Sequence, residues 1–459
     1  MSPTDIDRQT PAGRAALTVT LLGGSLAVAF ELYGTVTAMP AAAADLGRLE
    51  LYAWAFTGFV IAQVLAIVLA GRVVDRIGPV LPLMSGTMVF IIGLLMAGLA
   101  PSMLMLLIAR FVQGFGGGAL NLAFMVVIAQ AYDFRQRAWL MSALSFCWML
   151  PSFVGPPLAA WITTRFSWHW VFLAVVPFLL IVAVPGVRPL LELHRTRAAP
   201  ERQGNPVPIW AAFAGASGAA LLQLTGQRLD LPGLGAGAAG LVILAIGLPY
   251  LMPPGTVRLG RGLPAVMVTR GLACGAFFSA ESFLPLLLIE QHQFSLTQAG
   301  IFLAIGSTGW TLGSVVQASR RMLWRRDHII QFGAAMIGLG LGLAATAIWF
   351  ATSWVLIAAG FVLAGTGMGL LVPSTSLVNM QISEAALIGR NTSSLQVAEG
   401  LGNSLVTGMA GTLFAALHLS QDAAGTFGPI YAMATVVGLL TLAVSLRIGP
   451  VRNESSGIG

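Results

Sequence analysis

Several charged residues stand inside long apolar runs of this chain, where a charge needs a chemical reason, and four of them are candidates for function. Glu31, Arg110, Glu281 and Glu399 each lie several residues from the nearest polar stretch. A charge inside a bilayer is costly unless it meets a partner or a water-filled cavity. Burial favours the neutral form of a carboxyl, and a nearby guanidinium favours the ionised form. These residue types predict a site that takes up and releases protons, with Glu31 as the coupling acid and Arg110 as its modulator.

Small and polar residues accompany Arg110 along the same run. Gln113, Gly117 and Asn121 follow it at intervals of three and four residues, which place all four on one face of a helix. Such a stripe inside the membrane indicates the wall of a cavity. A structural arginine satisfied by backbone carbonyls is the alternative explanation of the same pattern.

Two further glutamates extend the candidate site into the second half of the chain. Glu281 lies at a depth similar to that of Glu31, and Glu399 shares a helical face with Gln396 and Asn403. Helix packing would also explain the second stripe, but a carboxyl without a partner favours a cavity. We expect both glutamates to line the substrate cavity, either to meet cationic substrates or as second choices for proton coupling.

The sequence lacks the patterns of other energy sources and reactions. It contains no lysine and no phosphate-binding GxxxxGK[ST] loop, so ATP-driven transport within this chain is not expected. No histidine lies in the middle of an apolar run, and no His/Asp or Ser/His pair shares one depth, which argues against an intramembrane enzyme. Cys147 and Cys274 form no CxxC metal motif. We expect no enzyme, no metal and no cofactor, with protons as the coupling ion.

The chain that must position these residues has 459 residues, of which 57% are apolar and 9% are charged. Soluble globular proteins carry roughly 25% charged residues. So few charges cannot cover a water-exposed surface of this size, which excludes a soluble enzyme, a nucleic-acid-binding protein and a disordered scaffold. The composition predicts an all-α integral membrane protein whose apolar spans lie in a lipid bilayer.

Apolar runs long enough to cross a bilayer occur fourteen times along the chain. An even number of spans places both ends of the chain on one side of the membrane. The predicted spans are 16–40, 51–70, 80–99, 103–132, 138–163, 168–187, 207–226, 231–252, 264–290, 299–319, 328–350, 354–382, 391–417 and 430–449.

The arginines give these spans a direction. With the N-terminus inside, nineteen of the 24 arginines fall on the inner side and two, Arg110 and Arg270, lie within spans. Only Arg48, Arg165 and Arg228 fall outside. This asymmetry is what the positive-inside rule predicts. Because one miscounted span would scramble the alternation, it supports fourteen spans with both termini in the cytoplasm.

The spans form two blocks of six that resemble each other weakly. RFVQGFGGGAL from Arg110 and GFVLAGTGMGL from Gly360 each occupy the fourth span of a block. Parallel repeats of this kind build many secondary transporters, whose substrate site lies between the repeats. Because Gly360 is the counterpart of Arg110, we expect the second block to lack a buried guanidinium.

The blocks divide the chain into five parts. We predict an N-terminal six-helix bundle over 1–187, a cytoplasmic linker over 188–206, a two-helix insert over 207–252, a C-terminal six-helix bundle over 264–449 and a cytoplasmic tail over 450–459. The two bundles already form a complete repeat. We therefore expect the insert to be peripheral and to make no contact with substrate.

Five short motifs carry a family resemblance. They are GRVVDRIGPV (71–80), RFVQGFGGG (110–118), PSFVGPPLAAW (151–161), ELYGTVTAMP (31–40) and WHWVFLAVVP (168–177). In this order and position they resemble the signature motifs of the major facilitator superfamily, and within it those of the fourteen-helix drug:proton antiporters. The chain departs from the family where Pro79 and Val80 replace a basic pair, and where Ala159 and Ala160 replace two glycines.

The resemblance assigns roles to two of these motifs. In the first motif, Gly71 and Gly78 are expected to allow a tight turn between two spans. The resemblance implies that this motif is a conformational latch that holds the cytoplasmic side closed, and a capped, solvated loop is the alternative. It also implies that the bend at the fifth span belongs to exporters, and simple helix packing is the alternative. The residues concerned are Gly71, Asp75, Arg76 and Gly78 for the latch and Gly155, Pro156 and Pro157 for the antiporter motif.

We therefore interpret the chain as a proton-coupled secondary active exporter of the major facilitator fold. The resemblance implies multidrug efflux of lipophilic or cationic small molecules by alternating access, in the plasma membrane of a bacterium. We expect a monomer with no nucleic-acid partner. A lipid or metabolite carrier, or an uptake symporter of the same fold, is the alternative. Substrate would bind mainly to aromatic side chains such as Phe30, Tyr33, Phe146 and Trp148.

Overall fold

The computed structural model describes residues 11–132, 134–195, 208–227, 231–319, 324–384, 387–419 and 422–451. Within these ranges the regular structure is helical, which confirms the all-α prediction. The N-terminal helices are α1 (Pro11–Leu46), α2 (Trp54–Ile77), α3 (Val80–Gly98), α4 (Met103–Ala131), α5 (Phe134–Arg165), α6 (His169–Leu173), α7 (Val175–Ala183) and α8 (Val187–Arg195). Short 3₁₀ turns, η2 (Leu49–Leu51) and η3 (Val184–Gly186), connect some of them.

The second half of the chain continues with long helices. They are α9 (Ile209–Gln227), α10 (Leu231–Leu251), α11 (Leu263–His292), α12 (Leu296–Ala318), α13 (Arg326–Trp349), α14 (Trp354–Ile382), α15 (Ile388–Leu417) and α16 (Ala423–Ser445). Each overlaps a predicted span, because the apolar runs that fill a bilayer also satisfy their backbone groups as helices.

Twelve helical stretches in the described residues are long and apolar enough to cross a membrane. The stretch from His169 to Arg195 counts as one of them, although α6, α7 and α8 divide it. The two remaining predicted spans coincide with α5 and α9, which are 32 and 19 residues long. Neither is among the twelve, and the apolar part of α9 is shorter, at Ile209–Leu224.

The predicted linker begins as a helix. α8 starts at Val187 and packs against α1, with Pro189 and Leu190 buried. The η3 turn, which contains Pro185, separates α8 from α7. Proline cannot supply the backbone N–H that an unbroken helix needs, which explains the break. The rest of the predicted linker and the tail beyond Val451 lie outside the described residues.

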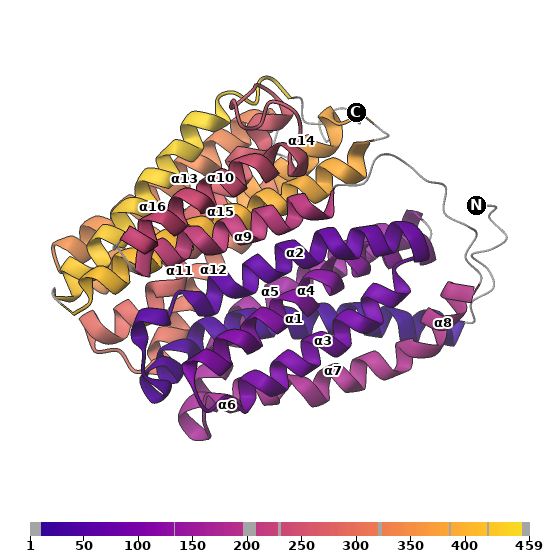
Figure 1. Ribbon diagram of the computed structural model, residues 1–459, viewed down its shortest axis with the longest axis horizontal. Helices are drawn as coiled ribbons and strands as arrows, with labels where there is room; N and C mark the ends of the chain where they lie inside the picture. The colour runs from indigo at the N-terminus through magenta and orange to yellow at the C-terminus, as the bar shows by residue number, and fades with distance from the viewer. Residues whose placement is uncertain are drawn as a thin grey trace.

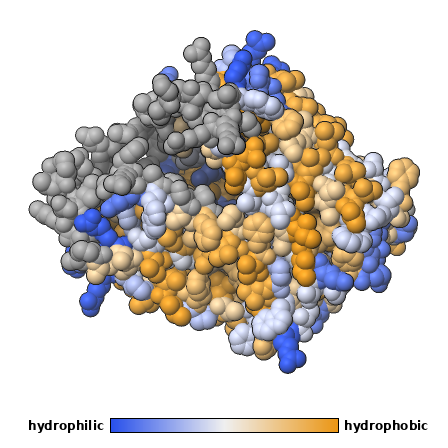
Figure 2. Space-filling model, turned by 180° about the vertical axis from the view of Figure 1, so that it is seen from behind, coloured by the Kyte–Doolittle hydropathy of each residue, from blue (hydrophilic) through white to orange (hydrophobic). Residues whose placement is uncertain are grey.

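The helices form two bundles, α1–α8 and α11–α16, with α9 and α10 beside them (Figure 1). Within the N-terminal bundle α4 packs between α2 and α3, and in the C-terminal bundle α14 packs between α12 and α13. The same arrangement in both bundles agrees with the weak internal repeat of the sequence. Hydrophobic residues dominate the middle of the face shown in Figure 2, as expected for a surface in contact with lipid.

Glycines in the fourth helix of each bundle allow this packing. A Cβ at Gly114 would lie 2.0 Å from the Phe59 carbonyl oxygen, and one at Gly369 would lie 2.1 Å from the Trp310 carbonyl oxygen. Only a residue without a side chain permits such close backbone approach. The glycine-rich segments that begin at Arg110 and Gly360 are therefore helix-packing surfaces.

The insert is less peripheral than the sequence predicts. α9 packs against both α2 and α15, which belong to different bundles, and α10 packs on α9. Gln223 of α9 is buried, with its Oε1 3.5 Å from the position of a Cβ at Gly408 of α15. The expectation of a peripheral insert is wrong for α9, because its small residues let it fit between the bundles. The absence of substrate contact stays a prediction.

The two bundles touch near one end of the helices, where the connection between α1 and α2 holds Tyr52. We call this the Tyr52 end, and the opposite end, where α8 ends and α9 begins, the linker end. The Tyr52 hydroxyl donates to the Ser282 carbonyl oxygen of α11 at 2.9 Å. A Cβ at Gly411 of α15 would lie 2.2 Å from Ala53 Cβ, so the bundles are in close contact here.

Candidate functional site

Glu31 and Arg110 meet inside the N-terminal bundle. α1 supplies the glutamate, α4 supplies the arginine, and Arg110 Nη1 donates to Glu31 Oε1 in an ion pair. The Thr35 hydroxyl, one turn along α1, donates to the same oxygen at 2.9 Å. Glu31 is 0% exposed and Arg110 is 1% exposed. The two residues chosen from the sequence are thus brought together in a site sealed from solvent in this conformation.

Neutral groups also hold the Arg110 side chain. Its Nε donates to the Ala55 carbonyl oxygen of α2 at 3.0 Å, and its Nη1 donates to Gln113 Oε1 at 2.9 Å. The Phe59 ring lies below the guanidinium, with its centroid 4.4 Å from Arg110 Cζ, a cation–π contact. Glu31 Oε2, by contrast, is buried and accepts no hydrogen bond from the described residues. Arg110 thus has partners other than Glu31, whereas Oε2 of Glu31 has no hydrogen-bond partner among the described residues.

The stripe on α4 is mostly buried. Arg110, Gln113 and Gly117 are buried, and Asn121 is half-buried. Gln113 packs against α3, since a Cβ at Gly93 would lie 2.6 Å from Gln113 Cγ. In this conformation the stripe is therefore not a continuous cavity wall, and its first two residues form the ion-pair network instead.

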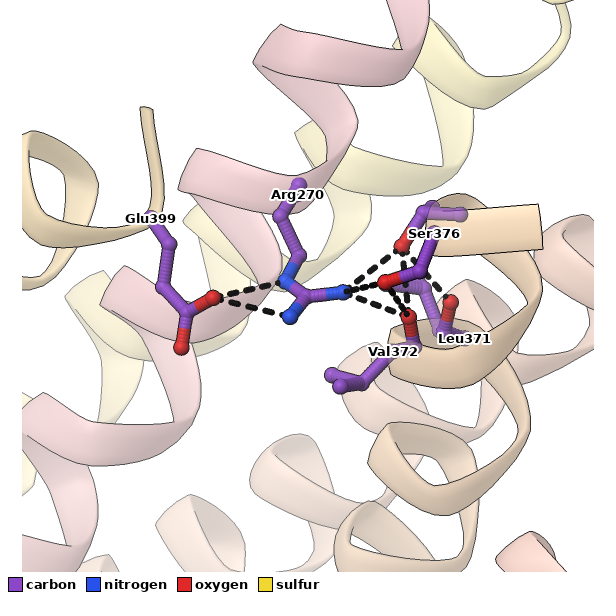
Figure 3. A network of polar contacts seen from close by, with 6 residues as sticks. Arg270, Leu371, Val372, Ser376 and Glu399 are labelled. Carbon is purple, nitrogen blue, oxygen red and sulfur yellow. Dashed lines mark hydrogen bonds and ion pairs between the residues drawn. The ribbon is translucent and has the colours of Figure 1, made fainter. Parts of the chain in front are cut away.

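A second buried network lies in the C-terminal bundle (Figure 3). Arg270 of α11 donates from Nε and Nη2 to Glu399 Oε2 of α15, at 3.0 and 2.8 Å. Its Nη1 donates to the Val372 carbonyl oxygen, to Thr375 Oγ1 at 2.9 Å and to Ser376 Oγ at 3.4 Å, all on α14. One guanidinium thus joins three helices of this bundle.

This network corrects two expectations from the sequence. The C-terminal bundle does contain a buried guanidinium, because Arg270 is 8% exposed. Glu399 is also not an unpaired carboxyl, because Arg270 is its ion-pair partner. The repeat comparison looked for an arginine on the fourth helix, at Gly360, whereas the C-terminal bundle carries its arginine on the first. Arg270 inside an apolar run was the available signal.

Glu281 faces the other bundle. It is half-buried on α11, and it interacts electrostatically with Tyr33 of α1. No hydrogen bond or ion pair joins its carboxylate to another described residue. Arg270 lies on the same helix, but its donors go to Glu399 and α14. Glu281 therefore presents a carboxyl without a fixed cation between the bundles.

The remaining polar residues of the predicted cavity lie on α15. Gln396 and Asn403 are both half-buried, on the same face as Glu399. Asn403 Oδ1 accepts a hydrogen bond from the Thr407 hydroxyl at 3.1 Å, while Gln396 Oε1 is buried without a donor among the described residues. The stripe on α15 therefore has a hydrogen-bond acceptor, Gln396 Oε1, that no described residue uses.

An apolar cavity of about 320 Å³ opens between α1, α5 and α7. Its lining includes Phe30, Val154, Gly155 and Phe178. Because residue 155 has no side chain, its backbone lies against α1, where an added Cβ would be 3.4 Å from Tyr33 Cβ. The volume is within the range of small-molecule pockets. Of the other predicted aromatics on α5, Phe146 is exposed and Trp148 is half-buried, and neither lines this cavity.

The antiporter motif lies where the two bundles meet. A Cβ at Gly300 of α12 would lie 2.7 Å from the Pro156 carbonyl oxygen of α5. Pro156 and Pro157 are inside the helix, where each removes one backbone hydrogen bond. The motif thus combines a weakened helix with a close contact to the other bundle.

The latch motif is only partly described. Gly78 ends α2 with a φ of 97°, a conformation that favours glycine, so it makes the turn into α3. Gly71 lies within α2 and packs toward Leu122 of α4, so its predicted part in the turn is wrong. Arg76 is exposed, and the side chain of Asp75 lies outside the described residues.

No metal site is evident in the part of the chain that the structure describes. There, no group of three or more His, Cys, Asp and Glu side chains is placed to hold an ion. Cys147 and Cys274 are free thiols on different helices.

Solved structures share this fold at low sequence identity. A crystal structure of an auto-inhibited POT family peptide transporter aligns with a TM-score of 0.70 and 16% identity, over 95% of this chain and 98% of that one. A crystal structure of a D-xylose–proton symporter aligns with a TM-score of 0.64 and 15% identity, over 96% and 98% of the two chains. These likenesses show the arrangement of the helices alone.

Sequence comparison extends the likeness to named relatives. The multidrug efflux pump SdrM of Staphylococcus aureus (strain N315) is 25% identical over 432 residues, which cover 88% of this chain and 91% of that one. A probable multidrug-efflux transporter, Rv1634, of Mycobacterium tuberculosis is 24% identical over 415 residues, 86% of each chain. The sequence profile of the Major Facilitator Superfamily matches residues 21–407. The chain therefore belongs to the major facilitator superfamily.

Proposed function

We propose that this protein is a proton-coupled exporter of lipophilic or cationic small molecules, of the multidrug efflux type. Relatives named as multidrug efflux pumps and transporters align over most of the chain, which supports an exporter. The observation that carries proton coupling is the Glu31–Arg110 pair. One carboxylate oxygen of this pair is buried without a donor among the described residues, and a proton bound there would neutralise the buried carboxylate.

Protonation of Glu31 would change the packing of α1. The proton neutralises the carboxylate and removes its attraction to Arg110. Arg110 keeps the Ala55 carbonyl oxygen, Gln113 and the Phe59 ring, so no buried cation is stranded. α1 then loses its strongest tie to α4. Tyr33 is also on α1 and interacts with Glu281 of α11. A change in the packing of α1 would therefore affect the contact between the two bundles.

Substrate would bind at two neighbouring places, one at the junction of the two bundles and one inside the N-terminal bundle. The Glu281 carboxyl has no fixed cation and suits the positive group of a cationic substrate, while the apolar cavity beside Phe30 and Gly155 suits a lipophilic one. Tyr33 lies between the two places, near Glu281 and against Gly155. Gln396 and Asn403 add hydrogen-bonding groups from α15, and Phe146 and Trp148 add aromatic surface on α5.

The membrane arrangement follows from the arginines and the helices together. We propose fourteen spans, adding α5 and α9 to the twelve, because the twelve alone would place the arginines between residues 188 and 202 on the outer side, whereas fourteen keep nineteen arginines inside. The linker end and both termini then face the cytoplasm of a bacterium, and the Tyr52 end faces outward. The protein is a monomer of the drug:proton antiporter branch. The Tyr52–Ser282 contact closes the outer side in this conformation.

The test is transport by the purified protein in liposomes. A pH gradient imposed across the membrane should drive accumulation of at least one lipophilic or cationic dye of a panel, and an uncoupler should abolish it. A dye flux that does not change when the pH gradient is imposed would contradict proton coupling. Transport of a fluorescent lipid, with no dye moved, would favour the lipid carrier.

A further inference from the structure

The mechanism above leaves the Arg270–Glu399 pair unused, although it has the same composition as the Glu31–Arg110 pair. Its two side chains come from α11 and α15, with Arg270 Nη2 2.8 Å from Glu399 Oε2. Both helices are among those long and apolar enough to cross a membrane. Charges in such a position are expensive to keep and mark functional sites.

Arg270 has partners that do not depend on Glu399. Its Nη1 is held on α14 by the Val372 carbonyl oxygen and by the hydroxyls of Thr375 and Ser376 (Figure 3). These acceptors are neutral, so they continue to bind the guanidinium when the carboxylate is neutralised. A proton on Glu399 therefore does not leave a buried cation without partners, which would be costly.

Glu399 is the more accessible of the two paired acids. Its side chain is 33% exposed, whereas that of Glu31 is 0% exposed. Both bonds from Arg270 go to Oε2, and Oε1 accepts no hydrogen bond from a described residue. A proton can thus reach Oε1 from solvent in the same conformation in which Glu31 is sealed.

Few other titratable groups face Glu399. Cys274, one turn along α11 from Arg270, is the titratable side chain that interacts with the pair. α9 and α14 carry no titratable residue, Tyr431 of α16 donates to the Ala280 carbonyl oxygen, and Glu50 of η2 pairs with Arg48. The titratable residues of α2 all lie near its last turn, at the linker end: Arg72, Asp75 and Arg76.

We propose that Glu399 is a second proton-exchange site, so that each export cycle moves two protons, one on Glu31 and one on Glu399. The inference rests on the proton-coupled export proposed above. A proton binds Glu399 Oε1 and converts the carboxylate to a neutral acid, while Arg270 stays cationic and bound to α14. α15 loses its ionic tie to α11 until the proton leaves and the pair forms again.

The direction of flux in preset gradients measures this number of protons. With the voltage held at zero by potassium and valinomycin, a pH difference of one unit balances a substrate gradient of about tenfold for one proton and about 100-fold for two. Proteoliposomes are therefore loaded with a transported dye at an opposing gradient of about 30-fold, between these limits. Wild-type protein should move dye further against the gradient, and Glu399→Gln should let it run back.

The controls separate this site from the exporter itself. Glu50→Gln removes a glutamate that also pairs with an arginine but is exposed, and it should behave as wild type. Glu399→Asp keeps a carboxyl and should keep the wild-type direction. Wild-type protein that lets dye run back, yet is driven by pH at smaller gradients, carries one proton and overturns the second site alone. Wild-type protein with no pH-driven flux overturns the exporter and the second site together.

Discussion

The two bundles of this protein each contain a glutamate paired with an arginine, and the pairs differ in their exposure to solvent. In the N-terminal bundle both partners are sealed, at 0% and 1% exposed. In the C-terminal bundle Arg270 is sealed but a third of the Glu399 side chain is exposed. In both, neutral acceptors support the arginine. If both acids are the proposed proton sites, this difference would let them exchange protons in different conformations while neither arginine is left without partners.

The largest difference should appear when each arginine is removed. Arg110→Ala leaves Glu31 buried without its charge partner, and it should lower the free energy of unfolding by about 3–5 kcal/mol. Arg270→Ala should cost less, about 1–3 kcal/mol, because water can reach Glu399. Thermal unfolding of both variants in detergent measures the order. A larger loss for Arg270→Ala would mean that the exposure of the acid does not set the cost.

Lysine in place of Arg110 tests whether the shape of the guanidinium matters as well as its charge. Arg110→Lys keeps the charge but lacks the planar fork that reaches Glu31, Gln113 and the Ala55 carbonyl oxygen at once. We expect it to transport poorly. Normal transport with lysine would show that only the positive charge at this position matters.

Glu281 is the acid without an arginine, and it should affect selectivity more than coupling. We expect its carboxyl to be neutral in the empty site and to release its proton when a cationic substrate takes the proton's place. Glu281→Gln should therefore weaken export of a cationic dye several-fold more than export of a neutral compound, since a charge-assisted hydrogen bond contributes about 1.5–3 kcal/mol. Flux of one cationic and one neutral substrate, side by side, is the measurement. Equal losses would assign Glu281 to coupling or packing.

The smallest effects should come from the hydroxyls that support each pair. Thr35→Val removes one hydrogen bond to Glu31, and Thr375→Val removes one to Arg270. Each should cost about 1 kcal/mol, because one hydrogen bond is lost without a change in shape. Thr35→Val should also shift the pH dependence of transport, because it acts on the acid directly, and Thr375→Val should not. A shift in both variants would show that the arginines tune the acids through their neutral partners.

Much of the fold could be predicted from the sequence, because apolar runs and arginine positions report directly on membrane spans. Glu31 and Arg110 could be paired in advance because both interrupt long apolar runs of one repeat. Arg270 and Glu399 could not, because α11, the counterpart of α1, carries the arginine of this pair instead of the glutamate, and α15 is not the counterpart of α4. Gly71 was misassigned because a glycine that fits two helices together looks the same in sequence as one that makes a turn.

The neighbours of α9 also could not be predicted from the sequence. Its small residues suit close helix contact, but composition does not say which helices are the neighbours. The structure places it against both α2 and α15. The apolar cavity beside Gly155 arises in the same way, from residues of α1, α5 and α7 that no local pattern connects.

The coupling role proposed for Glu31 is tested by measuring substrate-induced proton flux in the Glu31→Gln variant. The side chain is nearly isosteric and can still accept a hydrogen bond from Arg110, so the variant should insert and fold, and size-exclusion chromatography checks this. A pH-sensitive dye inside proteoliposomes then records the proton movement that substrate induces, with Glu50→Gln as the matched control. We predict that Glu31→Gln gives no substrate-dependent proton flux. Proton flux at the wild-type level would remove Glu31 from the coupling mechanism.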